Sequence, residues 1–265
     1  IFKVLLEIKE TILNNKSLYN KIINKYRIKN TIGYSMNSFI DYSDPLDIFS
    51  HLLVGSEGTL AFISSVTLNT ISDLEHKATG LIIYNSSSSA CNFVTDFKDS
   101  GATAIEFLDD RSLKTAVNIH NPPYNSKNIE ENFAGLLIEY QCENEGELGL
   151  RVQTAEKILQ KSNVLNISSG FSSDIYNREN LWKIRKGLYP TVGALRKIGT
   201  TVITEDIAVD IENFADIVDD MKIIFKSFGF TDAVTFGHAK DGNLHFVCSV
   251  DLETARGVKN YESLL

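Results

Sequence analysis

The chain has 265 residues, of which 43% are hydrophobic and 23% charged, with a formal net charge of -8 and a pI near 5.2. This composition is typical of a globular protein with one large or two modest domains, and it argues against disordered and fibrous classes. The acidic balance argues against nucleic acid and anionic membranes as main partners, although a local basic pocket could still hold a small acidic substrate.

The cysteines and the chain start bear on the cellular compartment. Cys91, Cys142 and Cys248 are scattered and never form a Cys-x-x-Cys pair, a pattern that fits reduced thiols in a cytoplasmic protein. No apolar run approaches the roughly 20 residues that a membrane helix needs, and the start does not resemble a signal peptide. The chain opens without Met, in the middle of an amphipathic pattern, so we expect the protein to extend upstream.

The first 73 residues carry mixed signals. Hydrophobic residues recur at helical spacing over residues 1–24, which predicts a helix. Residues 28–50 look irregular, with Asp44-Pro45 as a turn signal. Apolar and polar residues alternate over residues 60–71, which predicts a strand.

Beyond residue 76 the pattern changes to strands alternating with helices, so we place a domain boundary near residue 73 and expect domains at 1–73 and 74–265. The predicted strands cover residues 78–84, 103–108, 133–140, 200–206, 233–238 and 243–250. The predicted helices cover residues 87–98, 111–119, 145–161, 176–197, 211–228 and 252–264. This alternation predicts an α+β fold in which helices cover a sheet.

A glycine-flanked turn at residues 52–60 is the first motif that could carry chemistry. It reads Leu-Leu-Val-Gly-Ser-Glu-Gly-Thr-Leu, with Gly55 and Gly58 on either side of Ser56 and Glu57. Two glycines allow a tight turn with exposed N–H groups that could bind an anion, and the Ser and Thr hydroxyls add donors. A plain glycine turn leading into a strand would give the same pattern.

The second motif is a hairpin signal, Asp241-Gly242 between two apolar runs. If these two residues form the turn, His238 lies directly opposite His245 on one face, with Cβ atoms about 4.5–5.5 Å apart. Both imidazoles could then reach one metal ion, although zinc usually takes three or four protein ligands. A structural histidine pair is the alternative.

The third motif is a basic stretch on a predicted helix, Trp182-Lys183-Ile184-Arg185-Lys186-Gly187, followed by Arg196-Lys197. An arginine suits a substrate carboxylate because its planar fork donates two parallel, charge-assisted hydrogen bonds. A solvated helix face would carry the same residues.

In this order and spacing, the motifs resemble the FAD-linked oxidase family that includes D-lactate and D-2-hydroxyglutarate dehydrogenases. The resemblance touches most of the chain and rests on residues 29–35 (Lys-Asn-Thr-Ile-Gly-Tyr-Ser), 55–60, 181–185 and 237–245. Residues 44–48 and 199–206 look most like the large bacterial members, in which an iron–sulfur module follows the flavin dehydrogenase.

The resemblance implies a fold and a reaction. Residues 1–73 would be the end of a two-part FAD-binding domain, and residues 74–265 an antiparallel-sheet substrate cap covered by helices. The parent enzyme would oxidise a D-2-hydroxyacid, passing hydride to the flavin, with an iron–sulfur module or another electron acceptor as partner. That acceptor could bring it to a membrane, and a homo-oligomer is compatible with the family.

The resemblance also implies roles for individual residues. Arg185 would hold the substrate carboxylate, His238 and His245 would bind a divalent metal (zinc), and Asn243 would lie in the same pocket. The FAD would be lined by Gly33, Tyr34, Gly55, Ser56, Glu57, Gly58 and Thr59.

Departures from the family narrow these expectations. A glycine-rich loop upstream of Ile1 and a Glu-His-Gly element beyond Leu265 are missing, so the chain alone should be inactive. Thr204 stands where D-2-hydroxyglutarate dehydrogenases have a substrate-binding lysine, and Val247 where they have an asparagine. Lactate or glycolate is therefore the alternative substrate, and a non-catalytic metal-binding or interaction module is the rival from another class.

Overall fold

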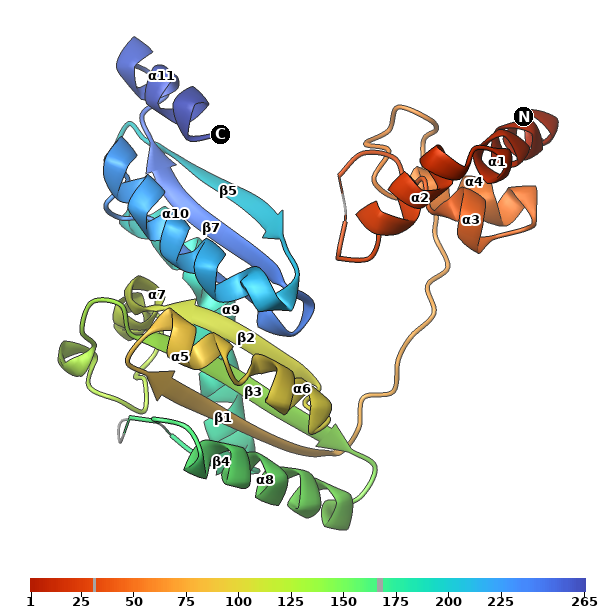
Figure 1. Ribbon diagram of the computed structural model, residues 1–265. Coiled ribbons are helices and arrows are strands. Elements are labelled where there is room, and N and C mark those ends of the chain that lie inside the picture. Colours follow the sequence, from red (N-terminus) through yellow and green to blue (C-terminus); the bar gives the residue numbers. More distant parts are fainter. Residues whose placement is uncertain (31, 166–168) are drawn as a thin grey trace. The chain divides into compact units, whose positions relative to one another are not determined.

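The computed structural model describes residues 1–30, 32–165 and 169–265, which form two compact units, Ile1–Ser72 and Asp73–Leu265. The first unit is helical (Figure 1), with α1 (Phe2–Asn14), α2 (Lys16–Lys25), α3 (Ser38–Asp41) and α4 (Pro45–Leu53). Its core is built from one or two apolar side chains of each helix: Leu5, Ile12, Ile22, Phe39, Ile48 and Leu52.

Two expectations for this unit need correction. The helix over residues 1–24 is broken at Asn15, whose side chain accepts a hydrogen bond from Leu18 N at 3.1 Å and so begins a second helix. Residues 28–50 are not irregular throughout, because Asp44 and Pro45 start α4. Asp44 caps Leu46 N at 2.7 Å, and a proline in the first turn loses no helical hydrogen bond.

The strand predicted over residues 60–71 was also wrong, because this segment forms no strand. The alternation is present in the sequence, but its apolar side chains face solvent; Phe62 is 91% and Ile71 94% exposed. A strand gains its hydrogen bonds from a neighbour, and the described part of the first unit contains no strand that could pair with it.

The second unit is built on a sheet with strand order β4-β1-β3-β2-β6-β7-β5, in which every pairing is antiparallel. The strands are β1 (His76–Tyr84), β2 (Ala104–Asp109), β3 (Ala134–Cys142), β4 (Phe171–Ser172), β5 (Thr201–Ala208), β6 (Val234–His238) and β7 (Asn243–Val250). The helices are α5 (Ser87–Cys91), α6 (Val94–Asp99), α7 (Asp110–Thr115), α8 (Glu145–Gln160), α9 (Ile175–Leu195), α10 (Phe214–Phe228) and α11 (Ala255–Leu264). The predicted α+β class is confirmed.

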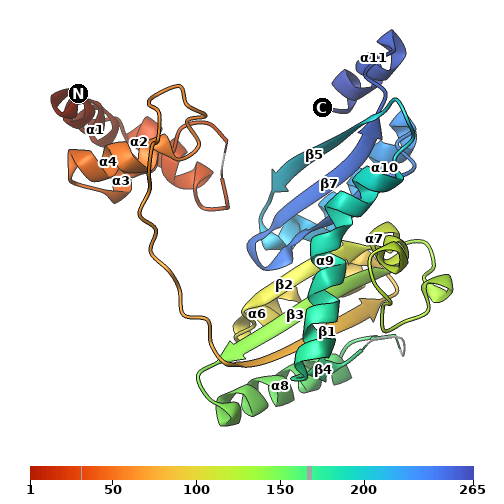
Figure 2. The same cartoon turned by 180° about the vertical axis from the view of Figure 1, so that it is seen from behind.

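Helices cover both faces of this sheet. Figure 1 shows α5, α6, α8 and α10 on one face, where their apolar side chains join a core that includes Phe107 and Phe214. Figure 2 shows the long helix α9 lying across the other face. The apolar stripe of α9 (Leu181, Ile184, Leu188 and Val192) packs there against strand residues such as Leu108 and Phe236. This face of the sheet carries the polar groups described below.

Smaller differences concern the ends of elements. The helix expected over residues 87–98 is interrupted between α5 and α6, and the one over residues 111–119 ends as the 3-10 turn η1 (Ala116–Asn118). Strand β4 was not predicted, because two residues show no periodicity. The three cysteines are free and buried. Within the described ranges, no helix combines the length and apolarity that a membrane crossing requires.

Candidate active site

The polar residues on the α9 side of the sheet come from adjacent strands at the same level. Alternation along β2 places Glu106 on the same face as Leu108, whose side chain belongs to the core under α9. Strand pairing then puts His238 of β6 opposite Glu106, and Asp206 of β5 opposite His245 of β7. Sheet register therefore assembles two carboxylates and two imidazoles on one face.

The predicted hairpin register was wrong by two residues. His238 pairs with Asn243, and His245 pairs with Phe236, so the histidines are diagonal rather than opposite. The loop is also longer than the expected two-residue turn, because the 3-10 turn η4 (Ala239–Asp241) precedes Gly242. A shift of two residues keeps side chains on the same face. The ring centroids of His238 and His245 lie 5.0 Å apart with an interplanar angle of 88°.

Gly242 fixes this loop and gives a first prediction. Its φ is +65°, and a Cβ at this position would lie 2.0 Å from the carbonyl oxygen of Val209. We expect Gly242→Ala to lower the free energy of unfolding by about 3 kcal/mol, because a left-handed alanine and a backbone clash add together. Urea denaturation of the purified chain would measure the loss.

Gly229→Ala is the matched control, because Gly229 has a φ of +80° and a Cβ added there would meet nothing within 4 Å. It carries only the conformational cost, about 1 kcal/mol. Equal losses in the two variants would contradict the close approach at Gly242.

Glu106 joins the two groups that the sequence singled out. One carboxylate oxygen accepts a hydrogen bond from Nδ1 of His238 at 2.7 Å, and the other accepts from Nε of Arg185 at 2.7 Å. The Glu106 side chain is only 8% exposed and that of Arg185 12%. Burial by itself raises the pKa of Glu106, but the hydrogen bond from His238 and the charge of Arg185 outweigh it and hold that pKa below its ordinary value. Glu106 is therefore a carboxylate near neutral pH.

The His245 ring is held in the same way. Its Nδ1 donates a hydrogen bond to Asp206 of the neighbouring strand. Burial lowers the pKa of His245 below its ordinary value and outweighs the opposing effect of Asp206, so the ring is neutral at pH 7. An ionised carboxylate can only accept, so both Nδ1 atoms carry a proton, and Nε2 of the neutral His245 ring is left with the lone pair.

This arrangement fits half of a metal site. An imidazole that ligates through one nitrogen almost always donates its other N–H to a carboxylate or a carbonyl, as both of these rings do. Two imidazoles alone do not complete a zinc shell. Within the part of the chain that the structure describes, no cluster of three or more His, Cys, Asp or Glu side chains could hold a metal. A third protein ligand would have to come from outside that set.

Arg185 lies on the sheet-facing side of α9 rather than on a solvated helix face. Its guanidinium carbon is 4.5 Å from the centroid of the Phe236 ring, and Phe236 is the strand partner of His245. One guanidinium edge thus binds Glu106, and the cation also stacks on the aromatic ring.

Sequence reasoning missed Glu106 and Asp206. The signal for Glu106 was available, since it is the single charged residue inside the apolar run Ala-Ile-Glu-Phe-Leu and a buried charge requires a partner. The signal for Asp206 is weaker. Its strand β5 lies at the edge of the sheet and most of its residues are half-exposed, so a charged residue there does not require a partner.

Replacing Glu106 would test this link. We expect Glu106→Gln to lower the free energy of unfolding by about 3 kcal/mol, because it leaves the Arg185 cation poorly paired in a nearly buried position. Chemical denaturation would measure this, with the exposed Glu156→Gln on α8 as the control that changes by less than about 0.5 kcal/mol. A Glu106→Gln variant with an unchanged free energy of unfolding would contradict the ion pair.

The remaining predicted pocket residues lie on the same face. Asn243 is buried, and its amide nitrogen donates to the carbonyl oxygen of Ile207 at 3.2 Å. Thr204 and Val247, the two departures from the family pattern, are direct strand partners on β5 and β7. The two departures from the family pattern therefore lie side by side, at one place near His245.

The predicted cofactor residues lie in the first unit, where the structure brings their two segments together. The Tyr34 hydroxyl lies 2.9 Å from the Thr59 hydroxyl, and Thr59 Oγ1 donates to Ser56 O at 2.6 Å. Gly33, Gly55 and Gly58 all have positive φ, as does Glu57 at +52°. Thr31, in the same stretch of the resemblance, lies outside the described residues.

The turn at residues 55–59 exposes backbone donors. The N–H groups of Ser56 and Thr59 are used within the turn, by Leu53 O and Ser56 O. Those of Glu57 and Gly58 have no acceptor among the described residues, and the space beside the Gly58 Cα is open. Unpaired N–H groups at a tight turn suit an anionic group such as a phosphate.

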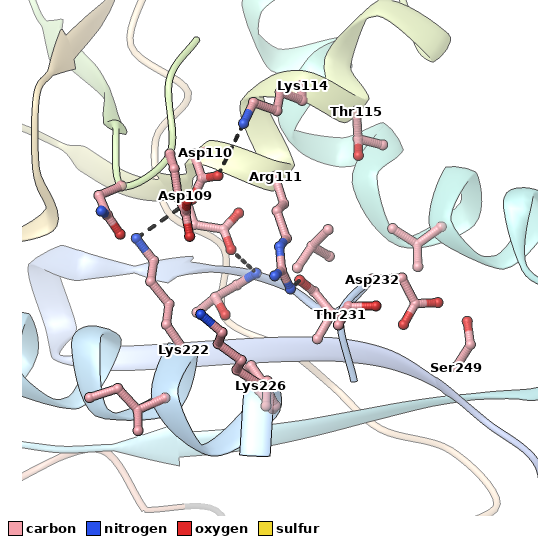
Figure 3. Close-up of a pocket in the computed structure, with 18 of the residues that line it drawn as sticks. Asp109, Asp110, Arg111, Lys114, Thr115, Lys222, Lys226, Thr231, Asp232 and Ser249 are labelled. Atoms are coloured by element: carbon pink, nitrogen blue, oxygen red, sulfur yellow. Dashed lines mark hydrogen bonds and ion pairs between the residues drawn. The ribbon is translucent and has the colours of Figure 1, made fainter. Parts of the chain in front are cut away.

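A larger cavity, of about 960 Å³, opens elsewhere in the second unit (Figure 3). It is lined by residues of α7, of α10 and of the start of β6, whereas His238 is at the far end of β6. Its lysines are largely occupied, since Lys114 and Lys222 lie 3.4 and 3.6 Å from the Asp110 carboxylate. Acidic and basic groups both line this cavity, and its volume alone does not make it the reactive site.

Comparison with known proteins identifies relatives. Residues 74–265 match the family model described as FAD linked oxidases, C-terminal domain. A mitochondrial D-lactate dehydrogenase [cytochrome] of Kluyveromyces lactis is 26% identical, over 82% of this chain and 35% of the relative. Glycolate oxidase subunit GlcD of Bacillus subtilis is 27% identical, over 80% of this chain and 43% of the relative. A mitochondrial D-2-hydroxyglutarate dehydrogenase of Arabidopsis thaliana is 28% identical, over 74% of this chain and 34% of the relative.

Among solved structures, an alkyldihydroxyacetonephosphate synthase superimposes with a TM-score of 0.57 at 14% identity, covering 82% of this chain and 43% of the other. This likeness concerns the fold. The chain spans between 34% and 43% of the length of the three curated relatives named above.

Proposed function

The chain belongs to the FAD linked oxidases, whose C-terminal domain it contains, and from that premise we propose that it is part of an enzyme that oxidises a D-2-hydroxyacid to the 2-oxoacid. The observation that supports the proposal most is the chain of contacts from Arg185 through Glu106 to His238. Through Glu106, a guanidinium that can bind a carboxylate is held close to an imidazole. A 2-hydroxyacid presents its carboxylate and its hydroxyl on neighbouring carbons. A site that recognises it therefore needs two such groups close together and held rigidly.

Each residue then has a definite task. Arg185 binds the substrate carboxylate through the guanidinium nitrogens that Glu106 does not occupy. His238 and His245 turn their Nε2 atoms toward the 2-hydroxyl side, with their orientation held by Glu106 and Asp206. Asn243 limits the pocket from the loop end of the hairpin. The enzyme's flavin, when bound, supplies the acceptor for the hydride from C2.

Residues 1–73 are proposed as the end of the FAD-binding domain. The unpaired N–H groups of Glu57 and Gly58, and the hydroxyls of Tyr34 and Thr59, provide donors for the cofactor. Gly33, Gly55 and Ser56 shape the backbone around them.

A divalent metal, with zinc as the first candidate, is proposed on His238 and His245. When bound it would polarise the 2-hydroxyl and lower its pKa. The fixed tautomers and the neutral His245 ring support this assignment, because metal ligands must be unprotonated at the binding nitrogen.

The substrate class is proposed to be a small monoacid such as lactate or glycolate. A five-carbon diacid needs a second cationic group beside the first, and the Thr204–Val247 strand pair places none on that side of His245. The electron acceptor is proposed to be an iron–sulfur module or another redox partner, on the strength of the sequence resemblance alone.

The complete gene product provides the test. We expect its visible spectrum to show bound flavin, and D-lactate or glycolate to reduce an artificial dye while the L-enantiomer of lactate does not. Absence of flavin, or of dye reduction with every 2-hydroxyacid in a panel that includes D-2-hydroxyglutarate, would overturn the proposal. Preference for D-2-hydroxyglutarate would overturn only the substrate assignment.

A further inference from the structure

A second polar cavity lies on the same face of the sheet, on the other side of Arg185 from the histidines. It measures about 330 Å³ and is lined by Lys77, Glu139, Gln141, Arg178, Trp182 and Lys186. These residues come from β1, β3 and α9. None of these residues belongs to the site assigned above, which uses β2, β5, β6 and β7 and shares only the helix α9, through Arg185.

The floor of this cavity is rigid because one buried carboxylate organises it. Glu139 accepts hydrogen bonds from the Trp182 indole at 2.6 Å and from the Thr79 hydroxyl at 2.7 Å on one oxygen. Its other oxygen accepts from the Gln141 amide at 2.6 Å. All three donors are neutral. Both carboxylate oxygens are thus already used within the protein, and the indole is held in one orientation.

The remaining charged groups around the cavity are cationic. Arg178, Trp182 and Lys186 follow each other at intervals of four along α9, so they lie on one side of the helix. The Lys186 ammonium lies 5.8 Å from the Trp182 ring centroid. Arg178 donates through Nε to Ser173 O at 3.3 Å, a contact that leaves its terminal nitrogens for other acceptors. With Lys77, three cations therefore surround one cavity in a protein of net charge -8.

Lys77 completes the cationic set from the strand side. Its side chain is 17% exposed, and its ammonium contacts Asp73, whose side chain is 85% exposed. A pair with so exposed a partner is worth little and can exchange for a better acceptor. Lys77 is also the strand partner of Gln141, so its stem is fixed beside the floor of the cavity.

We infer that this cavity is a binding site for a small organic dianion, such as a dicarboxylate or a phosphate monoester. Its volume falls within the range of small-molecule sites. Cationic side chains from both the sheet and α9 favour a ligand with two negative charges over one with a single charge. The Trp182 ring offers a flat apolar surface for the carbon skeleton. The inference does not depend on the proposed oxidation of a hydroxyacid.

Trp182 makes the site directly observable, because it is the one tryptophan of the chain. We expect succinate or glycerol 3-phosphate to change its fluorescence saturably, with half-saturation at millimolar concentration or below. Potassium chloride at equal ionic strength and the neutral diamide of succinate are expected to leave the emission unchanged. A response to one dianion alone identifies that chemistry as the ligand.

Variants of the chain assign the effect to the cavity. Arg178→Gln and Lys186→Gln are each expected to weaken dianion binding at least tenfold, whereas Lys183→Gln on the exposed side of α9 retains it. Emission of the unliganded variants shows whether the indole keeps its environment. A response equal to that of potassium chloride, or one that survives the Arg178→Gln/Lys186→Gln double substitution, would overturn the inference. Neither result requires flavin or turnover, so the outcome is separate from that of the proposed function.

Discussion

Replacing Arg185 by leucine is expected to lower kcat/KM of the complete enzyme for the proposed 2-hydroxyacid by about 1,000-fold, or about 4 kcal/mol. Arg185 shares the carboxylate of Glu106 with His238, and its nearly buried side chain stacks on Phe236. The substrate carboxylate is bound in both the ground state and the transition state, so most of the loss should fall on KM. Steady-state kinetics would separate the two constants.

Two companion variants control for this result. Arg185→Lys keeps the charge but loses the planar fork, so we expect a smaller loss of about 30-fold. Lys183→Leu changes a cation on the exposed side of the same helix and should leave both constants within twofold. Thermal unfolding of each variant shows whether Glu106, left without its partner, has weakened the fold. An Arg185→Leu enzyme that is folded and has an unchanged KM would exclude a carboxylate-binding role.

Replacing His245 by alanine is expected to remove the proposed metal and to lower kcat by about three orders of magnitude, since polarisation of the hydroxyl by a metal is worth several kcal/mol. The metal content of the purified full-length enzyme, measured by mass spectrometry, would be compared between wild type and variant. Asp206→Asn should weaken metal binding more modestly, by about 10- to 100-fold, because it acts through the orientation of the His245 ring.

His51→Ala is the matched control, since His51 lies on α4 of the first unit and stacks on Tyr42. It should change neither metal content nor kcat. Equal metal content in wild type and His245→Ala would show that the hairpin does not hold the ion. Full activity in a metal-free enzyme would show that the reaction does not need the proposed metal.

Many elements of the second unit could be predicted from periodicity, because most of its strands are long and helices such as α10 and α11 are amphipathic. Strands β1, β2, β3, β5, β6 and β7 were all expected within two residues of their ends. Breaks inside helices were missed, as at Asn15, because a capping side chain acts locally without disturbing the apolar spacing. The strand prediction for residues 60–71 was wrong for a different reason. A strand needs a neighbouring strand, and the local sequence does not show whether the tertiary structure provides one.

For the candidate site, residue types were easier to predict than their connections. The motif containing His238 and His245 indicated that both rings lie on one face, and the structure agrees. The register of the two strands depends on the loop conformation. The Asp241-Gly242 pair predicted a two-residue turn, but the loop also contains a 3-10 turn. The sequence marked Glu106 as a charge inside an apolar run, but its partner His238 lies on a strand that is far away in the chain. Contacts across a sheet cannot be deduced from local sequence.

The segment at residues 60–71 has a practical consequence for handling the protein. It holds twelve residues with no charge and no proline, with several large apolar side chains open to water. Segments of that kind add to one another as stacked ribbons when many copies meet. Concentrated solutions of this chain should therefore form insoluble fibrous material through its first unit, and a lysine in place of Phe62 or Ile71 should keep it dispersed.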